Sequence, residues 1–440
     1  MRDRGPGGVE LALPPDEAPV PLQLLPKTAA RTPEGHLSVG GVDLLALAEE
    51  FGTPLFAYDE AHLRARCHEA VEAWGSGVAY ATKAFLCKAM AHLAVEEGMD
   101  LDVATGGELH VALAAGVDPA RITVHGNNKS DAELARALDL GVGRIVVDSF
   151  DEIDRLERLA ADRARPQPVL IRVTPGVEAH THEFVRTGQE DSKFGFGLVS
   201  GEAATGVERL GRLDGIELVG VHAHIGSQVF RVASFADEVE ALAGFVVPLG
   251  LPELCVGGGL GVAYVGGETA PTIAQWAATV HEACRRAGIP ASTRITAEPG
   301  RAVVATAGIT LYRVGTIKDL PGVRTYVSVD GGMSDNPRPV LYGSGYEAML
   351  PRCPDAPRPR TVTVVGKHCE SGDVVVGDAR VPEDLAVGDV LATPVTGAYG
   401  YSMASNYNKV PKPAVVFVAD GAARVVVRRE VDDDLVRLDA

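Results

Sequence analysis

The sequence lacks the features that mark secreted, membrane-bound or nucleic-acid-binding proteins. Its 440 residues include only six cysteines, which lie far apart and form no CxxC pair. Cysteines dispersed in this way are typical of reduced thiols rather than of a disulfide framework or a zinc site. Basic residues are also in the minority, with 41 Lys and Arg against 59 Asp and Glu, and the formal net charge is −18. This acidic balance argues against nucleic acid or an anionic membrane as a partner.

Long apolar runs are missing too. No hydrophobic stretch approaches the length of a membrane span, and residues 1–30 lack the apolar segment of a signal peptide. Hydrophobic residues make up 46% of the chain and charged residues 23%, values ordinary for a globular protein. We therefore expect a cytoplasmic protein that is long enough to bury more than one hydrophobic core.

Proline dominates the start of the chain. Prolines recur among glycines and charged residues throughout residues 1–35, which excludes a regular helix or a central strand there. We expect an extended or disordered arm over these residues. Residues 36–44 are expected to form one short strand that joins a C-terminal β domain, followed by a helix over 45–51.

A regular alternation of short apolar runs and amphipathic helical stretches fills the next part of the chain, which we assign to residues 36–300. The apolar runs predict eight strands, at 78–82, 101–104, 122–125, 145–148, 169–174, 219–224, 254–257 and 295–298. Helices are predicted between them, at 88–97, 108–115, 132–140, 150–163, 236–247 and 273–287. This α/β pattern indicates a parallel (β/α)₈ barrel, with an open doubly wound sheet as the alternative.

Strand-like runs follow one another through turns beyond residue 300, and no helix of comparable length interrupts them. We therefore expect a separate all-β domain, a β-barrel or a sandwich, over residues 301–440. Its strands are predicted at 309–317, 325–330, 361–367, 373–379, 390–393, 414–419 and 423–428.

Reactive residue types gather at the C-terminal ends of the predicted barrel strands, where the active sites of such barrels lie. They are Lys83, Asp102, His125, His224, Gly257–Gly259 and Glu298. Lys83 follows a short apolar run and precedes Phe85 and Leu86, so we expect largely apolar surroundings that lower its pKa. A neutral amine of this kind is what a Schiff base with an aldehyde cofactor requires. The alternative is a lysine that reaches out to water.

Other residues allow two interpretations from the sequence alone. The glycines at 257–259 and Gly300 suit a phosphate that approaches the backbone closely, or simply tight turns. His222 and His224 lie two residues apart on one strand, a spacing that suits a metal, but no third ligand is evident and we expect no metal. Cys369 stands among charged neighbours, which is unusual for an inert core cysteine.

The chain resembles the diaminopimelate decarboxylases, which belong to the barrel-type pyridoxal-phosphate decarboxylases together with ornithine and arginine decarboxylases. The resemblance covers residues 36–430 and rests on motifs that occur in the family's order. They are YATKAF (80–85), DVATGGE (102–108), HGNNKS (125–130), GQEDSKFGF (188–196), HAHIGSQ (222–228), GGGLG (257–261), EPGR (298–301), DGGMSDNPRP (330–339), KHCESGD (367–373) and GAYGYSMASNYN (397–408). One departure is Phe85, where many members have asparagine.

The resemblance implies a site for pyridoxal 5'-phosphate in the barrel. Lys83 would form the Schiff base, and Glu298 would pair with the pyridine nitrogen and keep it protonated. His224 would stack on the ring, with Asp102 close by. The phosphate would be held through a hydroxyl, backbone amides and a phenol, from Ser227, Gly259, Gly300 and Tyr399. Arg301 is a further implied cofactor contact.

The resemblance also implies the substrate contacts and the reaction. Two arginines suit a second carboxylate and Glu370 suits the distal ammonium, while Cys369 would return a proton to the carbanion after decarboxylation. The implied contacts are Arg301, Arg338, Tyr342, Glu370 and Tyr399. The reaction would convert meso-2,6-diaminopimelate to L-lysine and CO₂, the last step of lysine biosynthesis.

Each site of this family is completed by the β domain of a partner chain, so the resemblance implies a homodimer. A decarboxylase of ornithine, arginine or a carrier-bound amino acid is the first alternative, although Cys-Glu-Ser and the arginine pair favour a dicarboxylic substrate. A racemase on a similar barrel fits the motif order less well. A non-catalytic regulator fits least, because it need not retain Lys83, Glu298 and Cys369.

Overall fold

A computed structural model describes residues 18–161, 163–177 and 192–440. Half of the expected N-terminal arm (residues 1–17) and positions 188–191 of the GQEDSKFGF motif lie outside these described residues. Among the described helices, none is both long and apolar enough to cross a membrane.

Eight parallel strands form the barrel that the sequence predicts. In the sheet they follow one another in chain order, apart from a short additional strand, β10 (Phe196–Gly197), that pairs only with β9. The Ala79 N–H donates to the Ala297 carbonyl (3.0 Å) and the Ala81 N–H to the Pro299 carbonyl (3.2 Å), which joins the first strand to the segment after the last. These bonds close the sheet, so the (β/α)₈ prediction is confirmed over the open-sheet alternative. The strands are β5 (Ala79–Ala81), β6 (Asp100–Val103), β7 (Ile122–Val124), β8 (Arg144–Val147), β9 (Gln167–Thr174), β11 (Ile216–His222), β12 (Glu253–Cys255) and β13 (Arg294–Thr296).

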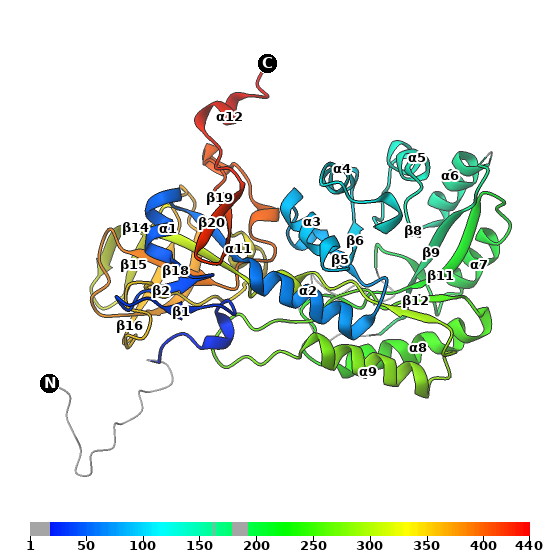
Figure 1. Cartoon of the computed structure of the whole chain (residues 1–440), viewed down its shortest axis with the longest axis horizontal. Helices are drawn as coiled ribbons and strands as arrows, with labels where there is room; N and C mark the ends of the chain where they lie inside the picture. The colour runs from blue at the N-terminus through cyan, green and yellow to red at the C-terminus, as the bar shows by residue number, and fades with distance from the viewer. Residues whose placement is uncertain (1–17, 162, 178–191) are drawn as a thin grey trace, which may run out of the picture.

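Helices surround the barrel (Figure 1), and several of them start at a side-chain cap that the sequence supplies. Ser130 and Glu133 form a reciprocal capping box at the start of α5, and Thr272 and Gln275 do the same for α9. The helices are α2 (Glu60–Trp74), α3 (Lys88–Glu96), α4 (Gly106–Ala114), α5 (Asp131–Leu140), α6 (Phe150–Ala160), α7 (Glu202–Leu210), α8 (Ala233–Leu249) and α9 (Ile273–Arg286). Two of them, α2 and α7, were not singled out from the sequence.

A second, mostly antiparallel sheet stands beside the barrel (Figure 1). Its order is β17-β16-β15-β14-β4-β19-β20, and β18 pairs with β14. The strands are β4 (Leu55–Asp59), β14 (Gly308–Leu320), β15 (Arg324–Val329), β16 (Arg360–Val365), β17 (Val374–Val381), β18 (Val390–Pro394), β19 (Ala414–Ala419) and β20 (Ala422–Val427). Beyond residue 300 the α-helices are short: α10 (Arg301–Val304), α11 (Arg338–Tyr342) and α12 (Asp432–Val436).

The N-terminal strand prediction was wrong in two respects. Residues 36–44 hold two strands, β2 (Leu37–Val39) and β3 (Val42–Asp43), which form a separate three-stranded sheet with β1 (Ala30–Arg31). The chain turns between them at Gly40, where a Cβ atom would lie 2.7 Å from the backbone of Val418. The strand that does join the second sheet is β4, after helix α1 (Leu44–Phe51).

The C-terminal part of the chain also reaches the mouth of its own barrel. The Tyr399 N–H donates to the carbonyl of Ala84 (2.8 Å), and the Ser402 hydroxyl donates to the same oxygen (3.0 Å). Phe85, the departure from the family pattern, is fully buried there and stacks on Tyr58 at 4.5 Å. The turn that carries Lys83 is therefore fixed from both sheets.

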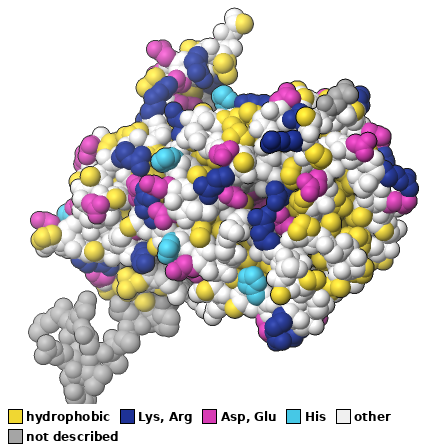
Figure 2. Space-filling model, turned by 45° about the vertical axis from the view of Figure 1, so that its right-hand side comes forward, with side chains coloured by type: hydrophobic (Ala, Val, Ile, Leu, Met, Phe, Trp, Pro, Cys, Tyr) yellow, Lys and Arg dark blue, Asp and Glu magenta, His cyan; other side chains and the backbone are white. Residues whose placement is uncertain are grey.

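Acidic and basic side chains are interspersed on the face of the molecule that Figure 2 presents. The negative net charge is thus not gathered into one acidic patch on that face.

Candidate active site

A cavity of about 380 Å³ opens at the C-terminal ends of the barrel strands. Every residue that the resemblance assigned to the cofactor lines it: Lys83, Asp102, His224, Ser227, Gly259, Glu298, Gly300, Arg301 and Tyr399. These residues come from widely separated parts of the sequence, and the closed barrel brings them together.

Lys83 lies on a single turn, η2 (Thr82–Ala84), directly after β5. The Thr82 hydroxyl donates to the Asp102 carbonyl (2.8 Å) and anchors this turn to the next strand. The Lys83 side chain is exposed to the cavity, and charged and phenolic groups surround it. Desolvation alone would lower its pKa, but Tyr399, Asp102 and Glu298 raise it by more, so the net direction is upward. The expectation of apolar surroundings and a lowered pKa was therefore wrong for the chain without cofactor.

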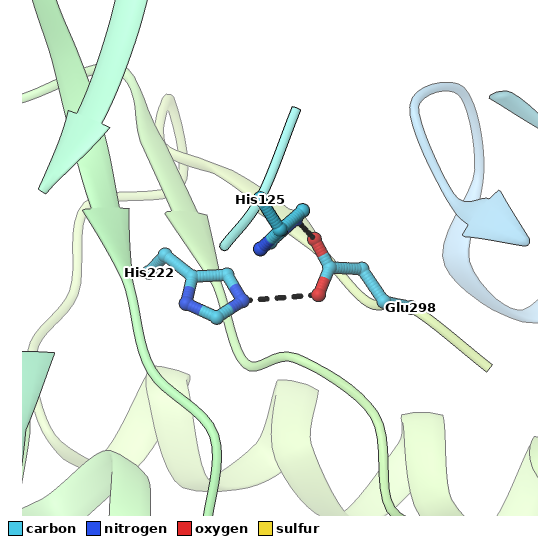
Figure 3. Close-up of side chains that lie close together, drawn as sticks. All are labelled: His125, His222 and Glu298. Carbon is cyan, nitrogen blue, oxygen red and sulfur yellow. Dashed lines mark hydrogen bonds and ion pairs between the residues drawn. The ribbon is translucent and has the colours of Figure 1, made fainter. Parts of the chain in front are cut away.

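Two histidines hold the carboxylate of Glu298, one at each of its oxygens (Figure 3). His125 Nε2 lies 2.9 Å from Oε1, and His222 Nε2 lies 3.0 Å from Oε2. All three side chains are buried. Because each carboxylate oxygen has more than one lone pair, this arrangement fixes the plane of the carboxylate and still leaves it able to accept a further donor.

The electrostatics of this cluster separate the two histidines. Burial lowers the pKa of His222 to about 4, so this imidazole is neutral and donates from Nε2. Burial also lowers the pKa of His125, but Asp102 and Glu298 outweigh it and the net direction is upward. For Glu298 burial raises the pKa, yet the neighbouring His125 and His222 hold it well below its usual range, and the carboxylate is ionised. Burial raises the pKa of Asp102 to about 6, 3.6 Å from His125 Nε2.

His125, His222 and Glu298 lie close enough together to hold a metal ion. This set differs from the pair considered from the sequence, His222 and His224, for which no third ligand was evident. However, the nitrogen–oxygen distances are those of hydrogen bonds, and they assign the cluster to orienting Glu298. His224 takes no part, since its Nδ1 accepts from the Gly258 N–H (3.2 Å).

The glycines in the cavity wall allow backbone segments to approach one another closely. Gly259 has φ +110°, and a Cβ atom there would lie 2.1 Å from the carbonyl oxygen of Gly226. At Gly300 a Cβ atom would lie 2.9 Å from the Ala81 side chain. A side chain at either position would displace neighbouring atoms, so backbone without side chains forms the cavity wall here. This cradle suits a phosphate ester.

A second cavity, also of about 380 Å³, continues from the first and shares Ser227, Arg301 and Tyr399 with it. Arg338 and Tyr342, two of the implied substrate contacts, line this second cavity. The two cavities thus bring the residues that the resemblance assigned to the cofactor next to two that it assigned to the substrate.

Sequence reasoning assigned no role to Arg172, which also lines the first cavity. Its guanidinium is 9% exposed and lies over the Phe194 ring at 4.4 Å, with Asp148 at 3.7 Å. Arg172 falls inside an apolar strand run, where periodicity marks it only as part of β9. A charged residue in such a run is itself the signal that could have identified it.

Cys369 and Glu370 lie apart from both cavities. Both are exposed, on the loop between β16 and β17. The loop is held from below by His368, whose Nδ1 lies 2.8 Å from the buried Asp373 carboxylate. The Cys369 N–H donates to the Asn408 side chain (3.1 Å). One chain by itself therefore does not bring Cys369 to Lys83.

Known proteins resemble this chain over almost its whole length. The family described as pyridoxal-dependent decarboxylase, pyridoxal binding domain, matches residues 60–305. The diaminopimelate decarboxylases of Mycobacterium tuberculosis and Bacillus subtilis are 49% and 47% identical to this chain, each over 94% of it and 97% of their own length. A crystal structure of diaminopimelate decarboxylase from M. jannaschii in complex with L-lysine has a TM-score of 0.87 at 31% identity, covering 94% of this chain and 98% of its own. The Helicobacter pylori enzyme complexed with L-lysine has a TM-score of 0.82 at 31% identity, covering 90% and 99%.

Proposed function

The chain belongs to the diaminopimelate decarboxylases, a pyridoxal-phosphate-dependent group of carboxy-lyases, and we propose that the residues of its barrel mouth perform this reaction as follows. The reaction converts meso-2,6-diaminopimelate to L-lysine and CO₂. The observation that supports the site most strongly is the convergence of Lys83, the clamped Glu298 and the glycine cradle on one cavity.

The residues of the cavity fit pyridoxal phosphate. When bound, this group supplies an aldehyde and an electron-accepting ring. Lys83 would offer the amine for the aldehyde, and Glu298, kept ionised by His125 and His222, would accept a hydrogen bond from the ring nitrogen. His224 would support the ring. Ser227, the backbone at Gly259 and Gly300, and Tyr399 would hold the phosphate, with Arg301 beside them.

The substrate end lies in the second cavity. Arg338 and Tyr342 bind the carboxylate of the stereocentre that does not react, while Glu370 pairs with the ammonium on that centre. Cys369 returns a proton to the reacting carbon after CO₂ leaves. Because Cys369 and Glu370 lie outside both cavities of their own chain, they act in the site of a partner, and the enzyme is a homodimer with two shared sites.

The six cysteines are all unpaired thiols in the structure, which supports a reducing, cytoplasmic location. Five of them are buried or partly buried, and Cys369 is exposed. This distribution fits one reactive thiol among structural ones.

A side-by-side product assay tests the function. Purified protein supplied with pyridoxal phosphate is given meso-diaminopimelate, ornithine, arginine or lysine, and the amine products and CO₂ are measured. We expect CO₂ and L-lysine from diaminopimelate only. Release of CO₂ mainly from ornithine or arginine would overturn the assignment in favour of a related decarboxylase, and no release from any substrate would favour a non-catalytic homologue.

A further inference from the structure

The two arginines of the second cavity, Arg301 and Arg338, differ in how many of their guanidinium nitrogens already donate to protein groups. Arg301 donates from Nη1 to the Tyr264 hydroxyl (2.6 Å) and from Nη2 to the Ser227 hydroxyl (2.9 Å). Its Nε is buried without an acceptor. Both terminal nitrogens of Arg301 are thus engaged with protein, and its guanidinium lies over the Tyr399 ring at 4.7 Å. Arg301 is built into the wall.

Arg338 makes a single side-chain hydrogen bond within the described residues. Its Nη1 donates to the Tyr346 hydroxyl at 2.5 Å. The plane of the guanidinium is supported by the Tyr264 ring, 4.2 Å below it. The Nε–Nη2 edge of Arg338 therefore has no hydrogen-bond partner among the described residues. This edge of a guanidinium can donate two parallel hydrogen bonds to the two oxygens of a carboxylate.

We propose that Tyr346 is a positioning residue that sets the enzyme's selectivity for a ligand with a distal carboxylate, by holding Nη1 so that the Nε–Nη2 edge of Arg338 faces the cavity. The inference rests on the proposed function, because it assigns the second cavity to the distal end of the substrate. Tyr346 is only 5% exposed and does not line the cavity itself, so it acts through Arg338.

Three further observations make Tyr346 a rigid support. Its ring packs edge-on against Tyr264, with centroids 5.3 Å apart at 79°. Burial raises its pKa to about 12, so the phenol remains neutral and keeps its hydroxyl. Arg338 is 4% exposed, so its side chain has little room to find another arrangement.

The selectivity can be measured by binding, with two ligands that differ only at the distal end. L-Lysine keeps the distal carboxylate of diaminopimelate, whereas 1,5-diaminopentane lacks it. Dissociation constants of both are measured on the cofactor-loaded enzyme for wild type and Tyr346→Phe, with KM and kcat for diaminopimelate alongside. Tyr326→Phe, a tyrosine on β15 away from both cavities, is the matched control.

Tyr346→Phe keeps the ring packing and removes only the hydroxyl. We expect it to weaken L-lysine binding about tenfold, the size of one lost hydrogen bond to a charged group, and to leave 1,5-diaminopentane binding within about twofold. KM for diaminopimelate should rise about tenfold with kcat near wild type. In an Arg338→Lys background, Tyr346→Phe should add nothing further, because the fork that it orients is gone. Tyr326→Phe should change none of these values.

Equal weakening of both ligands would overturn the inference, because it would indicate a general loss of structure rather than a lost orientation. Unchanged L-lysine affinity would overturn it as well. The proposed function is tested separately. If the wild-type enzyme binds L-lysine more tightly than 1,5-diaminopentane but releases no CO₂ from diaminopimelate, the proposed function is wrong, and the role of Tyr346 in ligand selectivity is unaffected.

Discussion

The barrel mouth and the loop that carries Cys369 differ in how much of a site one chain completes. In the barrel mouth, Glu298 has both oxygens bonded, and the turn carrying Lys83 is fixed from two sheets. On the loop, Cys369 and Glu370 are exposed, although Asp373 and His368 hold the backbone beneath them firmly. The loop is thus ordered but leaves its reactive groups exposed to solvent. The difference teaches that one chain completes the cavity in the barrel mouth but does not bring Cys369 and Glu370 into it.

The largest expected effect comes from substituting Lys83 in the barrel mouth and Cys369 on the loop in separate chains. Lys83→Ala and Cys369→Ala should each lower kcat by at least about 10²–10⁴, the usual contribution of a positioned proton donor or acceptor. If the two residues of one site come from different chains, unfolding, mixing and refolding the two variants should restore about a quarter of wild-type activity, because half the dimers are mixed and half their sites carry no lesion. Activity after refolding, with mixed dimers verified by mass, is the measurement.

The opposite result, in which mixing restores no activity, would contradict a site shared between chains. If both residues served the same chain's site, every site in the mixture would carry one lesion, and the mixture would be no more active than its parents. Lys88→Ala, an exposed lysine at the start of α3, is the control and should stay active alone. Borohydride treatment of the cofactor-loaded enzyme should place the pyridoxyl group on Lys83, and a label on Lys88 or Lys193 would contradict its assigned role.

Arg338→Lys should have the next largest effect, on substrate binding rather than on cofactor binding. Lysine keeps the charge but loses the planar fork, and truncating one partner of a buried charged contact costs roughly 2–5 kcal/mol. We expect kcat/KM for diaminopimelate to fall by the factor that corresponds to this free energy, while the affinity for pyridoxal phosphate stays unchanged. Exposed Arg285→Lys is the control. A kcat/KM near wild type would remove Arg338 from the substrate contacts.

His222→Gln should show that the stability of the barrel mouth depends on pH. The pKa of His222 is lowered to about 4 in the folded chain, from an ordinary value of 6.5. Between these values the unfolded chain binds a proton here that the folded chain does not, so this residue costs stability as the pH falls from 6.5 to 4. Relative to wild type, the variant should therefore gain up to roughly 3 kcal/mol on going from pH 7 to pH 4.

Denaturant unfolding at several pH values measures this difference. Exposed His68→Gln should follow the wild-type profile. A constant difference between wild type and His222→Gln across the whole range would show that His222 is not kept neutral by burial.

The smallest effect is expected for the stability of the exposed loop. Cys369→Ala removes an exposed side chain with no side-chain hydrogen bond among the described residues, so its free energy of unfolding should stay within about 0.5 kcal/mol of wild type. Denaturant unfolding measures this directly. A loss of several kcal/mol would mean that Cys369 is structural, and the contrast between the two regions would disappear.

The barrel could be predicted because its strands are buried on both faces and read as short apolar runs between capped helices. Strand β4 was missed, since its partners in the second sheet lie far away in the sequence and local pattern carries no trace of that pairing. The turn that divides residues 36–44 lies where Gly40 and Gly41 approach the backbone of Val418 and Gly421, neighbours that are distant in the sequence.

The motifs were sufficient to identify the residues around the barrel-mouth cavity, but they did not predict the pKa values of these residues. The pKa of Lys83 depends on Tyr399, Asp102 and Glu298, which lie beside it only once the barrel has closed. Likewise, the histidine pair in HAHIGSQ gives no sign that His222 serves Glu298 while His224 faces Gly258. Such partnerships are three-dimensional, and local sequence patterns do not encode them.

Strand β4 has a consequence for how the protein is made. Ala57 in β4 pairs with Ile309 on one side and Val416 on the other, so an early part of the chain lies in the middle of a late sheet. During synthesis the barrel can form as soon as its last strand has left the ribosome, whereas β4 gains its first partner, β14, only after that and its second, β19, near the end of the chain. Residues 301–440 expressed alone would lack their central strand, and the β domain is therefore not an independently folding unit.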